Sequence, residues 1–188
     1  MDRDQAWQIV TEHTESESLR NHMRAVEIAM RAYAKKHGED EEKWGVTGLL
    51  HDFDYEKYPN DALSPTEEHP SWGVNYLREH GCSEEICEAI MGHAHYTGVP
   101  RESLLAKVLF ATDELTGLIT AVTLVRPSKK IAEVKLKSIK KKWKQKSFAA
   151  GVNRDEIVEG CEALGFDLDE HMQFVLDAMK ERADEIGL

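Results

Sequence analysis

The sequence has few cysteines, no long apolar run and no surplus of positive charge. Its three cysteines, Cys82, Cys87 and Cys161, match neither a zinc knuckle nor a disulfide framework, which favours a reducing compartment. No apolar run approaches the length of a membrane span, and the first residues contain no apolar signal-peptide core, so we expect a cytoplasmic protein without a membrane partner. The formal net charge of −11 argues against non-specific nucleic-acid binding.

Strand signals are also absent, because no two alternating segments are joined by a hairpin turn. Apolar residues three and four apart predict instead a helix over residues 14–37, with Thr14 and Glu17 as a capping box and Gly38 as the stop. Similar patterns predict helices that end near His51, that end at Gly81, and that start at a Ser83 cap. The long apolar segment 100–125 has a helical period, although its β-branched end is ambiguous.

The last third of the chain changes in charge. Residues 126–148 are rich in lysine and contain one acid, Glu133, whereas the residues that follow form acidic amphipathic patterns. With 188 residues and 41% hydrophobic side chains, we expect one all-α domain over 1–188, with this basic segment between two acidic parts. The lysines of 129–146 are either a solvated face or a docking surface for an acidic partner.

Candidate metal ligands occur on separate predicted helices or at their ends, and facing helices of a bundle can direct such side chains to one point. Asp113 is the most informative, because a carboxylate inside an apolar helix is costly unless it is paired or bound to a metal. Alternatively, Asp113 and Glu114 could together form a polar stripe on the surface of this helix. The full candidate set is His22, His51, Asp52, His69, His93 or His95, and Asp113.

Each histidine also has a structural alternative. His22 could be a hydrogen-bonded core residue, and His69 could simply open a helix before Pro70. His93 and His95 are two residues apart, so both cannot face one point if their helix continues. The adjacent pair His51 and Asp52 is a stronger signal, since it offers an imidazole and a carboxylate at one helix end.

The order His22, His51-Asp52 and Asp113 resembles the HD-domain superfamily of metal-dependent phosphohydrolases. The resemblance implies an all-helical bundle core over about 18–125, followed by a helical extension over 126–188. It also implies one metal ion held by these four residues. Members with two metals add two histidines between the pair and the last aspartate, and His69 and His93 fall at suitable places, with Asp52 as the bridge.

The implied reaction is hydrolysis of a nucleotide or another small phosphoester by a metal-activated water. Asp52 would fix the metal geometry, Asp54 or His95 would move protons, and Lys57 and His95 would contact the substrate. Histidine and carboxylate ligands without cysteine suit one or two ions of Mn, Fe, Co, Ni or Zn. The branch that cleaves cyclic dinucleotides usually carries a lysine where this chain has Tyr55, which disfavours that substrate.

Two other functions fit the same residues. The superfamily also contains di-iron oxygenases that use four histidines and two aspartates. A non-enzymatic binding module stabilised by a metal is the third hypothesis, which the lysine-rich segment favours slightly.

Overall fold

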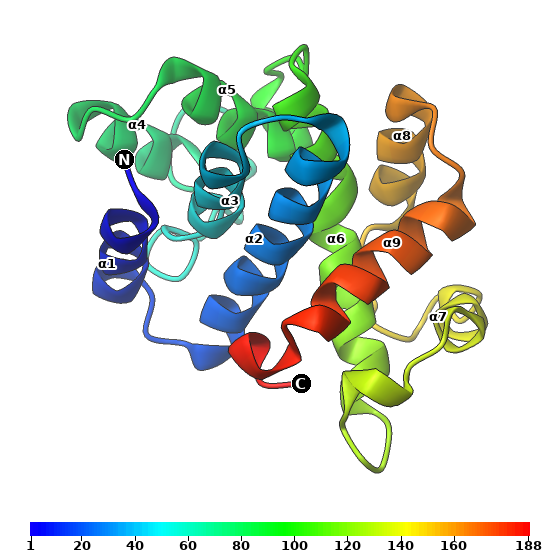
Figure 1. Ribbon diagram of the computed structural model, residues 1–188. Helices are drawn as coiled ribbons and strands as arrows, with labels where there is room; N and C mark the ends of the chain where they lie inside the picture. Colours follow the sequence, from blue (N-terminus) through cyan, green and yellow to red (C-terminus); the bar gives the residue numbers. More distant parts are fainter.

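The computed structural model describes residues 1–188, and it is all-helical, which confirms the predicted fold class (Figure 1). The nine α-helices are α1 (Arg3–His13), α2 (Glu17–His37), α3 (Glu41–Leu50), α4 (Ser71–Glu79), α5 (Glu84–His93), α6 (Leu104–Leu124), α7 (Leu136–Trp143), α8 (Arg154–Leu164) and α9 (Leu168–Glu181). Short 3-10 turns cover His95–Thr97, Ile131–Glu133 and Ala183–Ile186. None of these helices combines the length and the hydropathy that crossing a bilayer would require.

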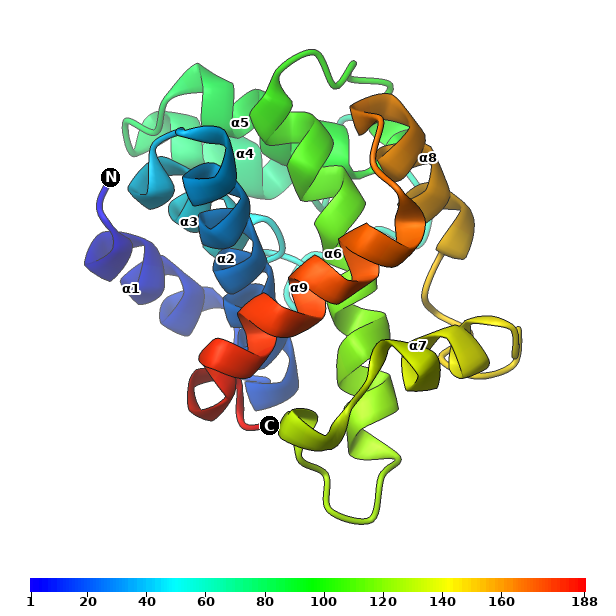
Figure 2. The same cartoon turned by 45° about the vertical axis from the view of Figure 1, so that its right-hand side comes forward.

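The two longest helices, α2 and α6, form the centre of the bundle. Figures 1 and 2 show α9 crossing both of them, with α3 beside α2 and α8 beside α6. Gly48 of α3 allows a close approach to α2, because a Cβ atom at this position would lie 3.0 Å from the backbone of Val26 and Glu27. This packing brings the end of α3, where His51 lies, next to α2 and α6.

The predicted N-cap of the second helix is wrong by two residues. Helix α2 begins at Glu17, and Ser16 is its N-cap, whose hydroxyl accepts a hydrogen bond from the Leu19 amide. Thr14 instead caps the end of α1, and its buried hydroxyl donates to the Phe53 carbonyl. A tertiary contact therefore uses the hydroxyl that the local pattern had assigned to the capping box.

The ambiguous end of the apolar segment is helical. Helix α6 continues to Leu124, and Ile119 and Val122 are buried against the rest of the core. Burial outweighs the weak intrinsic preference of β-branched residues for strands, because the helix packs against α2, α5, α8 and α9.

The lysine-rich segment contains one short amphipathic helix, α7, at the edge of the molecule opposite α1 (Figure 2). Ile139 is buried, and Leu136 and Trp143 pack against the core from the same helix. The lysines project outward, where Lys140 pairs with Asp169 of α9. Docking of an acidic partner on this face stays a prediction.

Candidate metal centre

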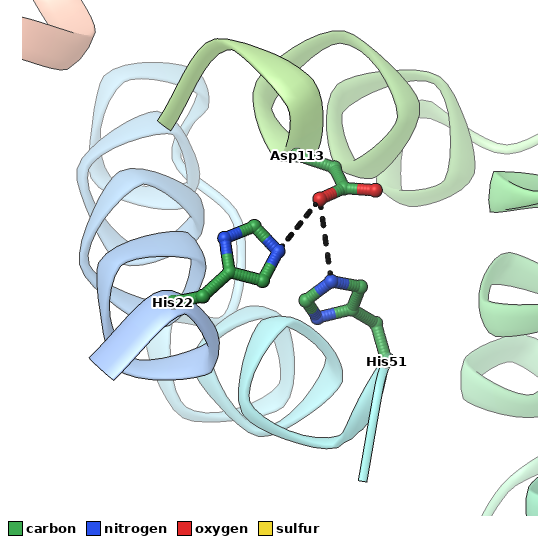
Figure 3. A group of neighbouring side chains, drawn as sticks. All are labelled: His22, His51 and Asp113. Carbon is green, nitrogen blue, oxygen red and sulfur yellow. Dashed lines mark ion pairs between the residues drawn. The ribbon is translucent and has the colours of Figure 1, made fainter. Parts of the chain in front are cut away.

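Helices α2, α3 and α6 bring three of the predicted ligands together (Figure 3). His22 projects from α2, His51 follows the last residue of α3, and Asp113 lies in the middle of α6. The Nε2 atoms of His22 and His51 lie 3.0 and 3.3 Å from the same oxygen, Oδ1 of Asp113. We call these three residues the first ligand group.

A second ligand group consists of Asp52, His69 and His93. The Nε2 atoms of both histidines lie 3.5 Å from Oδ1 of Asp52. Helix α5 ends at His93, and the backbone of Ala94 is extended, so His95 leaves the direction of the helix. The structure therefore brings His93, and not His95, to Asp52.

Asp52 lies between the two groups and faces both. While its Oδ1 faces His69 and His93, its Oδ2 lies 3.6 Å from Nε2 of His22 and 3.4 Å from Nε2 of His51. Each oxygen of one carboxylate is thus directed at a different group. This is the arrangement that a bridging ligand between two cations requires.

The hydrogen bonding of His51 shows that a cation fits the first group. Its Nδ1 donates to the Gly48 carbonyl at 2.8 Å, so Nε2 is the ring nitrogen that is available to bind a cation. This Nε2 is fully buried and has no hydrogen-bond partner, although carboxylate oxygens of Asp52 and Asp113 lie 3.4 and 3.3 Å away. Adjacent ligand atoms around one ion at about 2.1 Å are about 3.0–3.4 Å apart, so these spacings match a coordination shell.

The histidines of the second group are also oriented by hydrogen bonds of their Nδ1 atoms. Nδ1 of His93 donates to the Ile90 carbonyl, and Nδ1 of His69 lies 2.7 Å from Oδ1 of Asp54. Each bond directs the opposite ring nitrogen, Nε2, toward Asp52, as partners of metal-binding histidines commonly do.

Asp54 is buried, and both of its oxygens are engaged. Its Oδ2 accepts a hydrogen bond of 2.7 Å from the Gly73 amide, while Oδ1 contacts His69. A Cβ atom at Gly73 would lie 2.7 Å from this carboxylate, so the approach depends on glycine. Asp54 does not line the pocket at the ligands, where a proton carrier would have to lie. Its contacts are those of a residue that orients His69.

Electrostatics at the centre favour a positive charge between the carboxylates. Burial lowers the pKa of His51, but the charges of Asp52 and Asp113 outweigh burial and raise this pKa well above its usual value. Burial likewise raises the pKa of Asp113, but His51 and His22 outweigh it and hold the pKa of the carboxyl far below its ordinary value. A metal ion bound here would displace protons from the histidines and occupy the same attractive field.

A pocket of about 330 Å³ opens over both groups. Its outer wall contains Tyr55, Tyr96, His95, Glu114 and Glu156. Nε2 of His95 lies 2.9 Å from Glu159, and the Tyr96 hydroxyl donates to the His69 carbonyl.

Lys57, which the sequence placed near the substrate, points elsewhere. Its Nζ donates to the Glu12 carbonyl at the end of α1, and the side chain does not line the pocket. The predicted substrate contact of Lys57 therefore has no support in the geometry, because the chain after Asp54 turns toward α1.

Sequence reasoning missed the two glutamates of the wall. Burial, together with the charge of Asp113, raises the pKa of Glu114 to about 7. Burial also raises the pKa of Glu156. A cation bound beside them would lower both pKa values again. Glu114 had a signal in the sequence, since it follows Asp113 in an apolar helix, whereas Glu156 reaches the pocket only through the packing of α8 on α6.

Comparison with protein families adds independent support. The model of the HD domain matches residues 19–118. The chain belongs to the HD domain family. The matched residues contain all six ligands of the two groups, and proteins with an HD domain are generally hydrolases of the metal-dependent phosphohydrolase type. Searches of curated proteins and of solved structures found no significant match.

Proposed function

We propose that this HD domain protein is a metal-dependent phosphohydrolase that acts on a nucleotide or another small phosphoester. The observation that carries the proposal is the position of Asp52, whose two oxygens face two separate groups of ligands. A single carboxylate in this position suits two divalent ions, which is the arrangement used to attack and hold a phosphate ester.

The position of each residue indicates the role that we assign to it. The first group together with Asp52 would hold one ion, and His69 and His93 together with the same carboxylate would hold the other. When bound, divalent ions of this kind lower the pKa of a coordinated water and neutralise phosphate charge. Asp54 keeps His69 oriented, and His95 lies on the pocket wall where it can carry a proton to the leaving oxygen.

The composition of the pocket wall supports the idea that phosphate binding depends on metal ions. None of the residues that line the pocket is a lysine or an arginine. A phosphate dianion in an acidic pocket is repelled unless cations compensate for its charge. The proposal therefore predicts that phosphate binding requires the ions.

An oxygenase with two irons is the second candidate. Four imidazoles and two carboxylates without cysteine suit iron as well as Mn, Co, Ni or Zn. Oxygen consumption by the iron-loaded protein would favour this candidate. A protein that binds metal but turns over neither oxygen nor a phosphoester would be a metal-stabilised binding module.

The test begins with apoprotein reloaded separately with Mn, Fe, Co, Ni and Zn. Phosphate release from p-nitrophenyl phosphate and from nucleoside monophosphates is then measured for the wild type, for Asp52→Ala and for Asp61→Ala. Asp61 is an exposed aspartate outside the pocket, so its variant is a matched control. We expect metal-dependent release that Asp52→Ala abolishes and Asp61→Ala retains. Release that survives in Asp52→Ala, or no release with any metal, would overturn the proposal.

A further inference from the structure

A second cavity adjoins the pocket of the metal centre. Its volume is about 470 Å³, and it is lined by residues of α2 and α6 and by the last residues of the chain, Ile186 to Leu188. His22 and Gly117 line both cavities. Because His22 belongs to the first ligand group, the second cavity begins at the metal centre itself. We call this second cavity the side groove.

The side groove differs in chemistry from the pocket over the ligands. Apart from His22, no ionisable side chain lines it, whereas four carboxylates line the pocket. Ala121, Leu124 and Ile186 offer apolar contacts, and the Leu124 side chain is one of the few large hydrophobic groups that are exposed, at 48%. An uncharged, mainly apolar group gains free energy when it leaves water for such a groove, whereas a charged group would lose its hydration without a partner.

Gly117 lies where the two cavities meet, and packing does not account for it. It follows Asp113 by one turn on the same face of α6. A Cβ atom at Gly117 would contact only Val152, at an ordinary distance of 3.8 Å, whereas a Cβ atom at Gly160 would lie 2.7 Å from Ala111. Glycine inside a helix is destabilising relative to alanine. The open space over Gly117 therefore has no structural reason in the core, and a passage between the cavities supplies one.

We propose that Gly117 keeps open a passage from the metal centre to the side groove, and that this groove binds the uncharged, mainly apolar organic group of the phosphoester. The inference rests on the proposed hydrolase function and specifies its substrate class. The phosphate lies at the metal ligands, and the organic group extends over Gly117, between α2 and α6, toward Leu124. Gly117 thus determines specificity by the space that its missing side chain leaves.

The reaction itself is ordinary ester hydrolysis. A water oxygen forms a bond to phosphorus, and the bond from phosphorus to the ester oxygen breaks. The leaving oxygen takes a proton, so the products are inorganic phosphate and an alcohol whose organic group occupies the side groove.

The first experiment compares n-alkyl phosphates that differ only in the length of the chain. Ethyl phosphate and hexyl phosphate both release a primary alcohol of similar acidity, so a difference in rate reports on binding of the chain. We expect kcat/KM of the metal-loaded wild type to be about tenfold higher for hexyl phosphate than for ethyl phosphate, because each methylene group that leaves water is stabilised in the groove.

The second experiment assigns this preference to the side groove. Gly117→Leu fills the passage and Leu124→Ser removes an apolar contact, so in each variant the ratio of kcat/KM for hexyl phosphate to that for ethyl phosphate should fall toward one. Gly151→Leu and Val125→Ser are matched controls that should keep the wild-type ratio, because both residues are exposed and lie outside the two cavities. The ratio is internal to each variant, so partial loss of folded protein does not change it.

Binding of alkylphosphonates tests the groove without hydrolysis, because their bond from carbon to phosphorus is not cleaved by attack of water. Hexylphosphonate should bind the zinc-loaded wild type about tenfold more tightly than ethylphosphonate in a calorimetric titration. Gly117→Leu should lose this difference, and Gly151→Leu should keep it.

The outcomes separate the side groove from the proposed function. Equal cleavage and equal binding of the short and the long compounds would overturn the role of the groove and leave the hydrolase function intact. A preference for the long chain that persists in both Gly117→Leu and Leu124→Ser would overturn the assignment to this groove. Failure to cleave any ester, including p-nitrophenyl phosphate, with any metal would overturn the hydrolase function, and equal binding of the two phosphonates would then overturn the groove as well.

Discussion

The two ligand groups offer the same kinds of side chain but are built differently. The first takes its ligands from the two long central helices and from the end of α3, so helix packing sets their positions. The second depends on His69, which lies in the irregular segment between α3 and α4 and is oriented by a hydrogen bond to Asp54. A position set by core packing is harder to disturb than one set by a single polar contact, so we expect the second group to be the more easily weakened.

Removing Asp52, which both groups share, should have the largest effect on metal binding and activity. Asp52→Ala removes an oxygen that faces each group. His22 and His51 would still face Asp113, whereas His69 and His93 would lose the carboxylate that their Nε2 atoms face. We expect both ions and all hydrolytic activity to be lost, as measured by elemental analysis and phosphate release. Retention of a full metal content would contradict the bridging position.

Substitutions within one group should separate the two ions. Asp113→Ala should remove the ion of the first group, and His93→Ala should remove that of the second, because neither residue contacts the other group's ligands as closely as its own. Metal content and phosphate release of the two variants provide the comparison. Loss of both ions in each variant would mean that the groups bind metal as one unit.

A smaller and more selective effect is expected from Asp54. Asp54→Asn keeps the size of the side chain but weakens the bond that orients His69. Loss of such a supporting contact typically lowers metal affinity by about 10- to 100-fold. We expect this loss for one of the two binding steps in a calorimetric metal titration, and an unchanged titration for Asp61→Asn. Equal weakening of both steps would contradict the comparison.

The helices that carry His22 and Asp113 also predict an effect that does not involve the metal ligands and concerns stability at acidic pH. His171 of α9 joins them: its Nε2 donates to the Ala111 carbonyl of α6 at 2.8 Å, and its Nδ1 accepts from the Tyr33 hydroxyl of α2 at 2.6 Å. These bonds require the neutral ring. Burial lowers the pKa of His171 to about 4 from its usual 6.5.

Between these two pKa values the unfolded chain binds a proton that the folded chain does not. The contribution of His171 to the free energy of unfolding should therefore be present at neutral pH and decrease, by about 3 kcal/mol in total, as the pH falls through this window. Urea unfolding of wild type and His171→Gln at about pH 7 and about pH 5 measures the change. Equal pH dependence of the two proteins would contradict this assignment.

Part of the candidate ligand set is marked locally in the sequence, whereas His69 and His93 were implied by the resemblance to the HD-domain superfamily. Asp113 stands out in an apolar helix, and His51 and Asp52 are adjacent at the end of another. The contacts of Asp54 and Lys57 could not be predicted, since they depend on how the irregular segment after Asp52 turns toward Gly73 and Glu12.

Contacts between residues that are distant in the sequence explain two further features that the sequence pattern did not predict. Glu156 reaches the pocket because α8 packs on α6, and no local signal marks it. The predicted cap at Thr14 was wrong because a buried contact with Phe53, a residue distant in the sequence, uses the same hydroxyl.

In the arrangement that we propose, Asp52 joins two metal sites. The most direct test is the metal content of reconstituted wild type beside Asp52→Ala, Asp113→Ala and His93→Ala, measured by elemental analysis. We expect two equivalents in the wild type, one in each of the single-group variants and none in Asp52→Ala. One equivalent in the wild type that Asp52→Ala retains, or no metal at all after reconstitution, would contradict it.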